Sequence, residues 1–171
     1  RRNTPPHRII CMTRVLFVCL GNICRSPLAE AVFRHQVRER GVEDRFEIDS
    51  AGTSNYHIGD PPDRRSTATA KQHGITVAGS ARQIRIEDLR TFDYIIVMDA
   101  QNLADVERLK AAGGGTAKVH RLREWDPQTG SRDVPDPYYG GADGFEEVQA
   151  IVERSSAAFL EHLIAGAADG V

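Results

Sequence analysis

Short apolar runs alternate with longer amphipathic stretches along this chain of 171 residues. Each apolar run is followed by residues typical of turns or helix caps, as expected for buried parallel strands. Alternation of strands with helices predicts βαβ units, and therefore an α/β fold built on a parallel sheet. The runs predicted as strands cover residues 15–19, 46–50, 94–98 and 117–120.

Four stretches have the periodicity of amphipathic helices. The first is followed by Gly41, a residue typical of helix C-termini, and the third begins after Asp99. The last is predicted to begin with a capping box formed by Asp143 and Glu146, and it then repeats apolar residues on one face. The predicted helices cover residues 28–37, 62–73, 100–111 and 143–163.

Two segments are expected to be irregular, 52–62 and 121–141. Each follows a predicted strand, so each is expected at the carboxyl edge of the sheet. Open α/β sheets bind their ligands along that edge. We therefore expect a functional site there, beside the end of the first strand at Cys19.

Length and composition favour one domain, which we place at residues 13–166. Residues 1–12 are basic and contain prolines, and we expect them to form a flexible N-terminal extension with Met12 as a start. The formal net charge of -2 argues against a nucleic-acid or membrane partner. The longest apolar run is too short to span a bilayer, and residues 1–11 lack the apolar stretch of a signal peptide.

The three cysteines, Cys11, Cys19 and Cys24, lie close together near the N-terminus. Disulfides there would not staple a fold of this length. Such clustering fits a reducing cytoplasm, where a closely spaced pair is more often reactive than structural. We expect a cytoplasmic protein.

The first predicted strand leads directly into a motif with a nucleophile. Cys19 ends the strand, Gly21 and Asn22 follow in a loop, and Arg25 precedes Ser26-Pro27, which is expected to open a helix. Loop N–H groups facing a helix N-terminus bind anions, and an arginine fork matches two phosphate oxygens. Glycine in the loop lets the amides turn inward. The alternative is a cysteine that packs as a small buried hydrophobe.

Attack of a Cys19 thiolate on a phosphate ester requires an acid to protonate the leaving group. Three Asp-Pro pairs offer a carboxyl group, at Asp60, Asp126 and Asp136. Proline favours an extended conformation for the residue before it, which projects the carboxylate. Only Asp136 is followed by two aromatics, Tyr138 and Tyr139. For Asp60 and Asp126 we prefer a turn role; for Asp136 spacing alone leaves both roles open.

Two motifs together resemble the low-molecular-weight protein tyrosine phosphatase family. These are CLGNICRSP at residues 19–27 and DPYYG at 136–140, in that order and at this separation. The resemblance extends from about residue 13 to 163 and includes SAGTSNYHIGDPPD at 50–63 and FDYIIVMD at 92–99. It implies a four-stranded parallel sheet flanked by helices, the Rossmann-like three-layer architecture of phosphotyrosine phosphatase I.

The resemblance also assigns roles. Cys19 is the nucleophile, Arg25 binds phosphate, and Asp136 is the general acid and later the base for water. Tyr56 and Tyr138 flank the substrate ring. Asn22 and Ser26 brace the loop and the thiolate, although Ser26 is equally well placed as a helix N-cap. The residues expected to cradle the phosphate are Leu20, Gly21, Asn22, Ile23, Cys24, Arg25 and Ser26.

No cofactor and no metal are expected, because loop amides and Arg25 already neutralise phosphoryl oxygens. The expected partners are proteins that contain phosphotyrosine, with inorganic phosphate or another oxyanion as product or inhibitor. Cys24 resembles a thiol that traps oxidised Cys19 as a disulfide, with a loop-filling role as the alternative. A histidine common in the family just before the ARQ stretch is Gly79 here.

Three other functions compete with tyrosine phosphatase. A protein arginine phosphatase on the same fold resembles this chain, but by resemblance that branch has threonine where Ile23 stands. An arsenate reductase coupled to thioredoxin needs later cysteines, and none follows Cys24. A phosphate-binding module without catalysis needs neither Cys19 nor Asp136.

Overall fold

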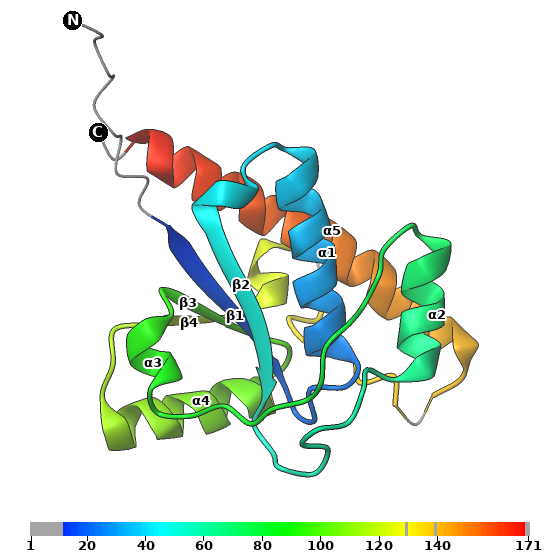
Figure 1. Cartoon of the computed structure of the whole chain (residues 1–171), viewed down its shortest axis with the longest axis horizontal. Coiled ribbons are helices and arrows are strands. Elements are labelled where there is room, and N and C mark those ends of the chain that lie inside the picture. Colours follow the sequence, from blue (N-terminus) through cyan, green and yellow to red (C-terminus); the bar gives the residue numbers. More distant parts are fainter. Residues whose placement is uncertain (1–11, 129, 139, 170–171) are drawn as a thin grey trace, which may run out of the picture.

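A computed structural model describes residues 12–128, 130–138 and 140–169 (Figure 1). Its centre is a four-stranded parallel sheet in the order β2-β1-β3-β4. Cys19 lies opposite Gly52 and Val18 lies opposite Val97, so the carboxyl ends of three strands meet at one edge. The strands are β1 (Thr13–Cys19), β2 (Phe46–Gly52), β3 (Tyr94–Val97) and β4 (Lys118–Arg121).

Helices cover both faces of the sheet and complete three layers (Figure 1). The layer on one face contains α1 (Arg25–Glu39), α2 (Arg64–Gln72) and α5 (Ala142–Asp169). The other face carries α3 (Asp88–Thr91) and α4 (Ala100–Gly113). Two short 3₁₀ helices, η1 (Glu43–Arg45) and η2 (Leu122–Trp125), precede β2 and follow β4.

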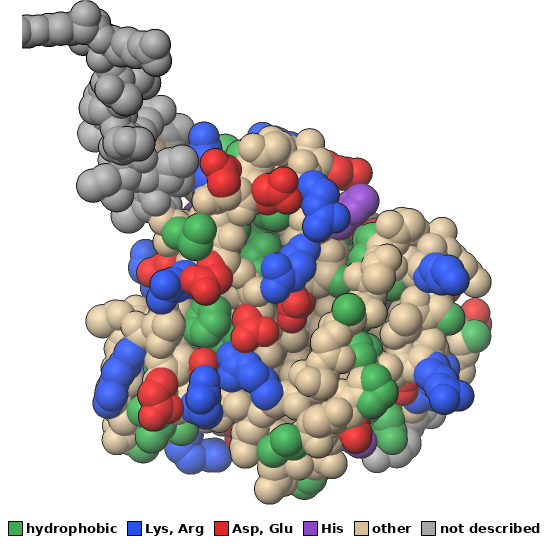
Figure 2. Space-filling model, in the orientation of Figure 1, with side chains coloured by type: hydrophobic (Ala, Val, Ile, Leu, Met, Phe, Trp, Pro, Cys, Tyr) green, Lys and Arg blue, Asp and Glu red, His purple; other side chains and the backbone are tan. Residues whose placement is uncertain are grey.

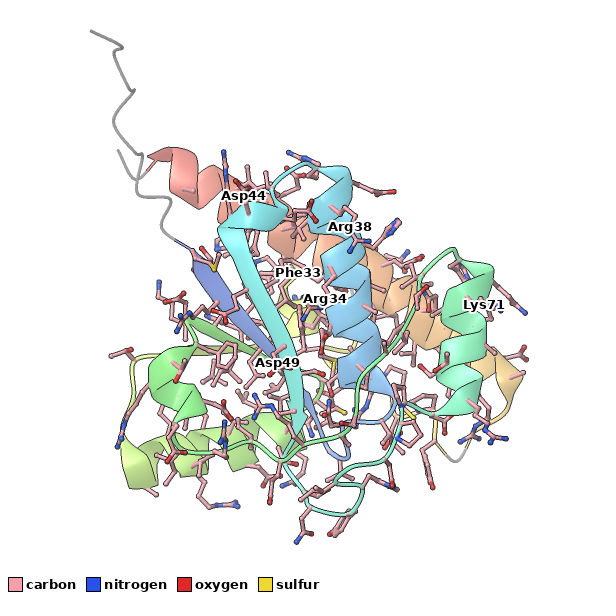
Figure 3. All side chains as sticks on the ribbon, viewed as in Figure 1. Phe33, Arg34, Arg38, Asp44, Asp49 and Lys71 are labelled. Carbon is pink, nitrogen blue, oxygen red and sulfur yellow. The ribbon has the colours of Figure 1, made fainter. Side chains whose placement is uncertain are left out.

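Strand β1 is buried on both faces, which explains why it is apolar at successive positions. Phe17 belongs to the core shared with α1 and α5, whereas Leu16 and Val18 belong to the core shared with α3 and α4. The ring of Phe17 lies 5.5 Å from that of Phe33, which lies 5.7 Å from that of Phe159. Phe33 points from α1 toward the sheet (Figure 3). These contacts fix α1, and with it the loop that joins β1 to α1.

The predicted fold class is confirmed, and all four predicted strands are present within two residues of their expected ends. The four predicted helices are α1, α2, α4 and α5. Helix α3 and the two 3₁₀ helices were not predicted, because each is too short to show a hydrophobic period. Among the described residues, no helix combines the length and the apolar character that crossing a membrane requires.

Two predicted caps are wrong. Helix α5 begins at Ala142, so Asp143 lies inside its first turn and does not form a capping box with Glu146. Helix α1 begins at Arg25 with Cys24 as its N-cap, so Ser26 is not a cap. The predicted extension lies outside the described residues apart from Met12, and so does Tyr139.

Asp126, one of the three Asp-Pro pairs, has a structural role. Its carboxylate accepts hydrogen bonds from Arg154, Arg123 and the backbone N–H of Gln128. Burial opposes ionisation, but these hydrogen bonds outweigh it and lower the pKa of Asp126. The preference for a turn role at this position therefore agrees with the structure, and the charge ties η2 to α5.

Candidate active site

The loop between β1 and α1 folds back on the sulfur of Cys19. The backbone N–H of Asn22 donates to Cys19 Sγ at 3.3 Å, and Ser26 Oγ lies 3.0 Å from the same sulfur. Asn22 has φ of +56°, the left-handed conformation that reverses the chain here. Among the described residues it is the one non-glycine residue with positive φ.

The side chain of Asn22 holds this conformation through three hydrogen bonds. Its amide nitrogen donates to Ser26 Oγ at 2.8 Å and to Ser50 Oγ at 3.0 Å. Its amide oxygen accepts the backbone N–H of Arg82 at 3.0 Å. Ser50 then donates to Glu30 at 2.7 Å. Because Asn22 donates to Ser26, the hydroxyl proton of Ser26 is left for Cys19 Sγ or for the carbonyl of Ala51.

Two arginines hold this network from outside, Arg34 and Arg82. Arg34, on α1, pairs with Glu30 at 3.0 Å (Figure 3). Arg82 pairs with Asp49 on β2 at 3.1 Å and with Asp88 at 3.0 Å. The polar chain behind the loop is therefore anchored to α1, β2 and α3.

Glycine acts here differently from the prediction. Gly21 does not adopt positive φ; instead, a Cβ at this position would lie 2.9 Å from His57 Cδ2. A second glycine, missed in the sequence, is more constrained. A Cβ on Gly52 would lie 2.7 Å from the carbonyl oxygen of Leu20 and 3.1 Å from the N–H nitrogen of Asn22. β2 can approach the loop only because Gly52 has no side chain.

Arg25 is buried and points its guanidinium toward the same loop. Its Nη1 donates to Asp99 at 2.6 Å and to the carbonyl of Val134 at 3.0 Å. Its Nη2 lies 3.6 Å from Asp136. Burial disfavours the charge, but Cys19, Asp99 and Asp136 outweigh it and raise the pKa of Arg25. Arg25 therefore supplies a permanent positive charge beside the sulfur.

The segment that carries Asp136 is fixed by a residue that sequence reasoning missed. Arg65 donates to the carbonyl of Tyr138 at 2.9 Å, and its guanidinium lies 4.7 Å from the ring of Phe145 and 5.6 Å from that of Tyr138. Asp63, the N-cap of α2, pairs with Arg65 at 3.0 Å. Asp136 itself accepts the backbone N–H of Tyr138 at 3.0 Å. Contacts with α2 and α5 thus hold the Asp136 segment beside Arg25.

A pocket of about 130 Å³ opens above the loop. Asn22 and Ser26 lie behind its floor, where they hold the loop. His57 also lines the wall, although it was not among the predicted site residues, and its ring centroid lies 6.1 Å from that of Tyr138. Tyr56 stands at the rim with 74% of its surface exposed. The predicted residues that line the pocket are Cys19, Leu20, Gly21, Ile23, Cys24, Arg25, Tyr56, Asp136 and Tyr138.

The two cysteines of the pocket differ in chemistry. Burial, together with the negative charge of Asp63, Cys19 and Asp136, raises the pKa of Cys24 to about 12. Cys24 is therefore a neutral thiol at physiological pH. Cys19 receives the hydrogen bond from Asn22 and lies near Arg25, which suits an anionic nucleophile. Together these groups can bind a tetrahedral anion and deliver a proton to its leaving group.

Comparison with known proteins identifies the family of this chain. The family model described as "Low molecular weight phosphotyrosine protein phosphatase" matches residues 14–167. The chain belongs to this family. The human member is 50% identical over 149 residues, which is 86% of this chain and 93% of the human protein.

Solved structures show the same fold. YfkJ from Bacillus subtilis is 40% identical with a TM-score of 0.84, covering 91% of this chain and 96% of its own. A Drosophila arginine phosphatase is 36% identical with a TM-score of 0.83, covering 87% of this chain and 96% of its own. The family membership and the fold predicted from the sequence are confirmed.

Gly79 is the position at which the resemblance to the family led us to expect a histidine. Behind the loop, Gly79 lines a cavity of about 150 Å³ together with Asn22, Glu30 and Ser50. Beside this cavity the side-chain amide of Asn22 donates to Ser50, and Ser50 donates in turn to Glu30.

Gly52→Ala tests the close approach of β2 to the loop. The new Cβ would displace the carbonyl of Leu20 or the N–H of Asn22, so we expect the affinity for inorganic phosphate to fall about ten- to a hundredfold. Titration calorimetry with phosphate measures this loss. Gly166→Ala, where a Cβ meets nothing within 4 Å, is the control. Unchanged phosphate binding in Gly52→Ala would contradict the predicted constraint.

Proposed function

We propose that this chain hydrolyses phosphotyrosine monoesters in proteins through a phosphocysteine intermediate. One observation carries the proposal: the sulfur of Cys19, the buried charge of Arg25 and the carboxylate of Asp136 share one small pocket. A module that only binds phosphate would require neither the thiol nor the acid. Membership of the family supports the same activity.

In the first step, Cys19 attacks phosphorus and the bond from phosphorus to the tyrosyl oxygen breaks. Asp136 gives its proton to that oxygen, so tyrosine leaves neutral. In the second step, the Asp136 carboxylate takes a proton from water, whose oxygen attacks phosphorus. The bond from sulfur to phosphorus breaks, Cys19 leaves as thiolate, and inorganic phosphate is released.

In both steps, the loop and Arg25 stabilise the negative charge on the phosphoryl oxygens. The N–H groups of residues 20–26 and the guanidinium bind the equatorial phosphoryl oxygens, so this mechanism uses no metal and no cofactor. Asp99 and the carbonyl of Val134 hold Nη1 of Arg25, which leaves Nη2 for the phosphoryl group and Asp136. Such preorganisation avoids reorienting dipoles during the reaction.

Preference for tyrosine rests on the walls of the pocket. Ile23 presents an apolar side chain that branches at Cβ as threonine does, but it is longer and has no hydroxyl. An apolar wall favours a phenyl ring, whereas a phosphorylated guanidinium group would lose hydrogen bonds there. Tyr56 and Tyr138 add aromatic surface for the ring. The arginine phosphatase among the structural neighbours makes phosphoarginine the second candidate.

A reducing compartment such as the cytoplasm suits this chemistry, because the nucleophile acts only as a thiolate and is lost on oxidation. If a peroxide oxidises Cys19 to a sulfenic acid, the Cys24 thiol in the same pocket would attack its sulfur, forming a disulfide and releasing water. Phosphotyrosine proteins are the proposed substrates, and inorganic phosphate or a similar oxyanion is the product or inhibitor.

The direct test compares one peptide carrying phosphotyrosine, phosphoserine or phosphoarginine. We expect kcat/KM for phosphotyrosine to exceed that for the other two by about tenfold or more, because only the phenyl ring fills the apolar pocket. Cys19→Ser should lower turnover of phosphotyrosine at least about a thousandfold while phosphate still binds. A higher kcat/KM for the phosphoarginine peptide than for the phosphotyrosine peptide would contradict the proposal and identify phosphoarginine as the substrate.

Asp136→Asn isolates the role of the acid. We expect kcat on a phosphotyrosine peptide to fall by about 10²–10³, because phenolate then leaves without a proton. Dinitrophenyl phosphate, whose leaving group needs no proton, should lose far less. Asp60→Asn changes another Asp-Pro pair, one that contacts His57 at 3.1 Å, and serves as the matched control. Equal losses on both substrates would refute the assignment.

A further inference from the structure

A second groove begins at the rim of the active-site pocket and shares Leu20 and Tyr56 with it. It has a volume of about 460 Å³ and is lined by the segment after β2 and by α4. These two segments lie along the lower edge of the molecule in Figure 1. The groups that line it are mostly polar. They belong to Leu20, Thr53, Ser54, Asn55, Tyr56, Gln83, Ile84, Asp105, Arg108 and Leu109.

The floor of this groove is fixed by the same loop that forms the active site. The N–H groups of Thr53 and Ser54 donate to the carbonyls of Cys19 and Leu20 at 2.9 and 3.0 Å. The amide of Gln83 donates to the carbonyl of Thr53 at 3.1 Å. The groove is therefore preformed and continuous with the pocket, so a ligand that enters one lies at the mouth of the other.

Of the two charged side chains that line the groove, the positively charged one is the more exposed. The side chain of Arg108 is 75% exposed, whereas that of Asp105 is 27% exposed. Asp105 already accepts hydrogen bonds from Gln101 at 3.1 Å and from Arg108 at 3.3 Å. A ligand in the groove consequently meets the guanidinium before it meets the carboxylate. Elsewhere, Figure 2 shows acidic and basic side chains intermingled over the face that carries α1 and β2.

Asp136 and Tyr138 line another part of the pocket, where Arg65 holds their segment against α2 and α5. A phosphotyrosine ring that fills the pocket leaves its main chain at the rim, and the polypeptide must continue along the surface. The rim between Leu20 and Tyr56 leads directly into the groove.

We propose that this groove binds the residues that flank phosphotyrosine in a protein substrate, and that Arg108 selects an acidic side chain among them. The proposal rests on the proposed function, since it extends the same site. Arg108 contacts neither the phosphoryl group nor the pocket, so it sets the choice of substrate and takes no part in the chemical steps.

The test compares two phosphotyrosine peptides that differ only in having acidic or basic residues on both sides of the phosphotyrosine. Each kcat/KM is divided by the kcat/KM for p-nitrophenyl phosphate. This small substrate fills the pocket without reaching the groove, so general losses of activity cancel. We expect the wild type to prefer the acidic peptide. Arg108→Glu should lower that preference about two- to fivefold, as expected for an exposed ion pair, or reverse it.

Arg38→Glu is the matched control. Arg38 is 69% exposed and lies 3.5 Å from Glu43, much as Arg108 lies beside Asp105, but it sits on α1 away from the groove (Figure 3). If turnover of p-nitrophenyl phosphate persists, either of two results would contradict substrate binding in the groove. One is an unchanged peptide preference in Arg108→Glu, and the other is an equal change of preference in Arg38→Glu. A wild-type protein that hydrolyses neither p-nitrophenyl phosphate nor the peptides would overturn the proposed function as well.

Discussion

The left-handed conformation of Asn22 is the constraint on which the site depends. A non-glycine residue in that region of backbone space costs about 1–2 kcal/mol, so surrounding contacts must hold it. Here the side chain is bonded to Ser26, Ser50 and the backbone of Arg82, and its own N–H reaches the sulfur of Cys19. One residue thereby joins β1, α1, β2 and the segment after α2. Strain in the loop is thus offset by a network built on rigid elements.

Charge at the site is arranged around one buried cation. Arg25 is balanced by Asp99, which is held as the N-cap of α4, and by Asp136, which comes from a loop more than a hundred residues away in the sequence. Cys24 stays neutral because burial and neighbouring negative charge raise its pKa. Cys24 therefore keeps its proton, and the proposed nucleophilic attack falls to Cys19. The carboxylate of Asp136 remains partly exposed, which leaves it access to water and to a leaving group.

Much of the fold, and the loop that carries Cys19 and Arg25, could be predicted because their signals are local. The apolar strand, the loop and the arginine lie within ten residues of one another, and buried strands differ from amphipathic helices in their hydrophobic period. Gly52, Arg65 and Asp99 were missed as site residues, because each acts on residues far away in the sequence. Ser26 was open to two readings, since a serine before proline is typical of a helix start; its bonds to Asn22 and Ala51 appear only once β2 is in place.

The proposed mechanism requires a covalent bond between phosphorus and the sulfur of Cys19. Mass spectrometry of a rapidly quenched reaction detects that bond directly. The enzyme is mixed briefly with a phosphotyrosine peptide, quenched in acid and digested with trypsin. The fragment spanning residues 15–25 contains both pocket cysteines, so its fragment ions distinguish them. We predict a phosphoryl group on Cys19 alone. A phosphoryl group on Cys24, or none on either sulfur while phosphate is released, would contradict the mechanism.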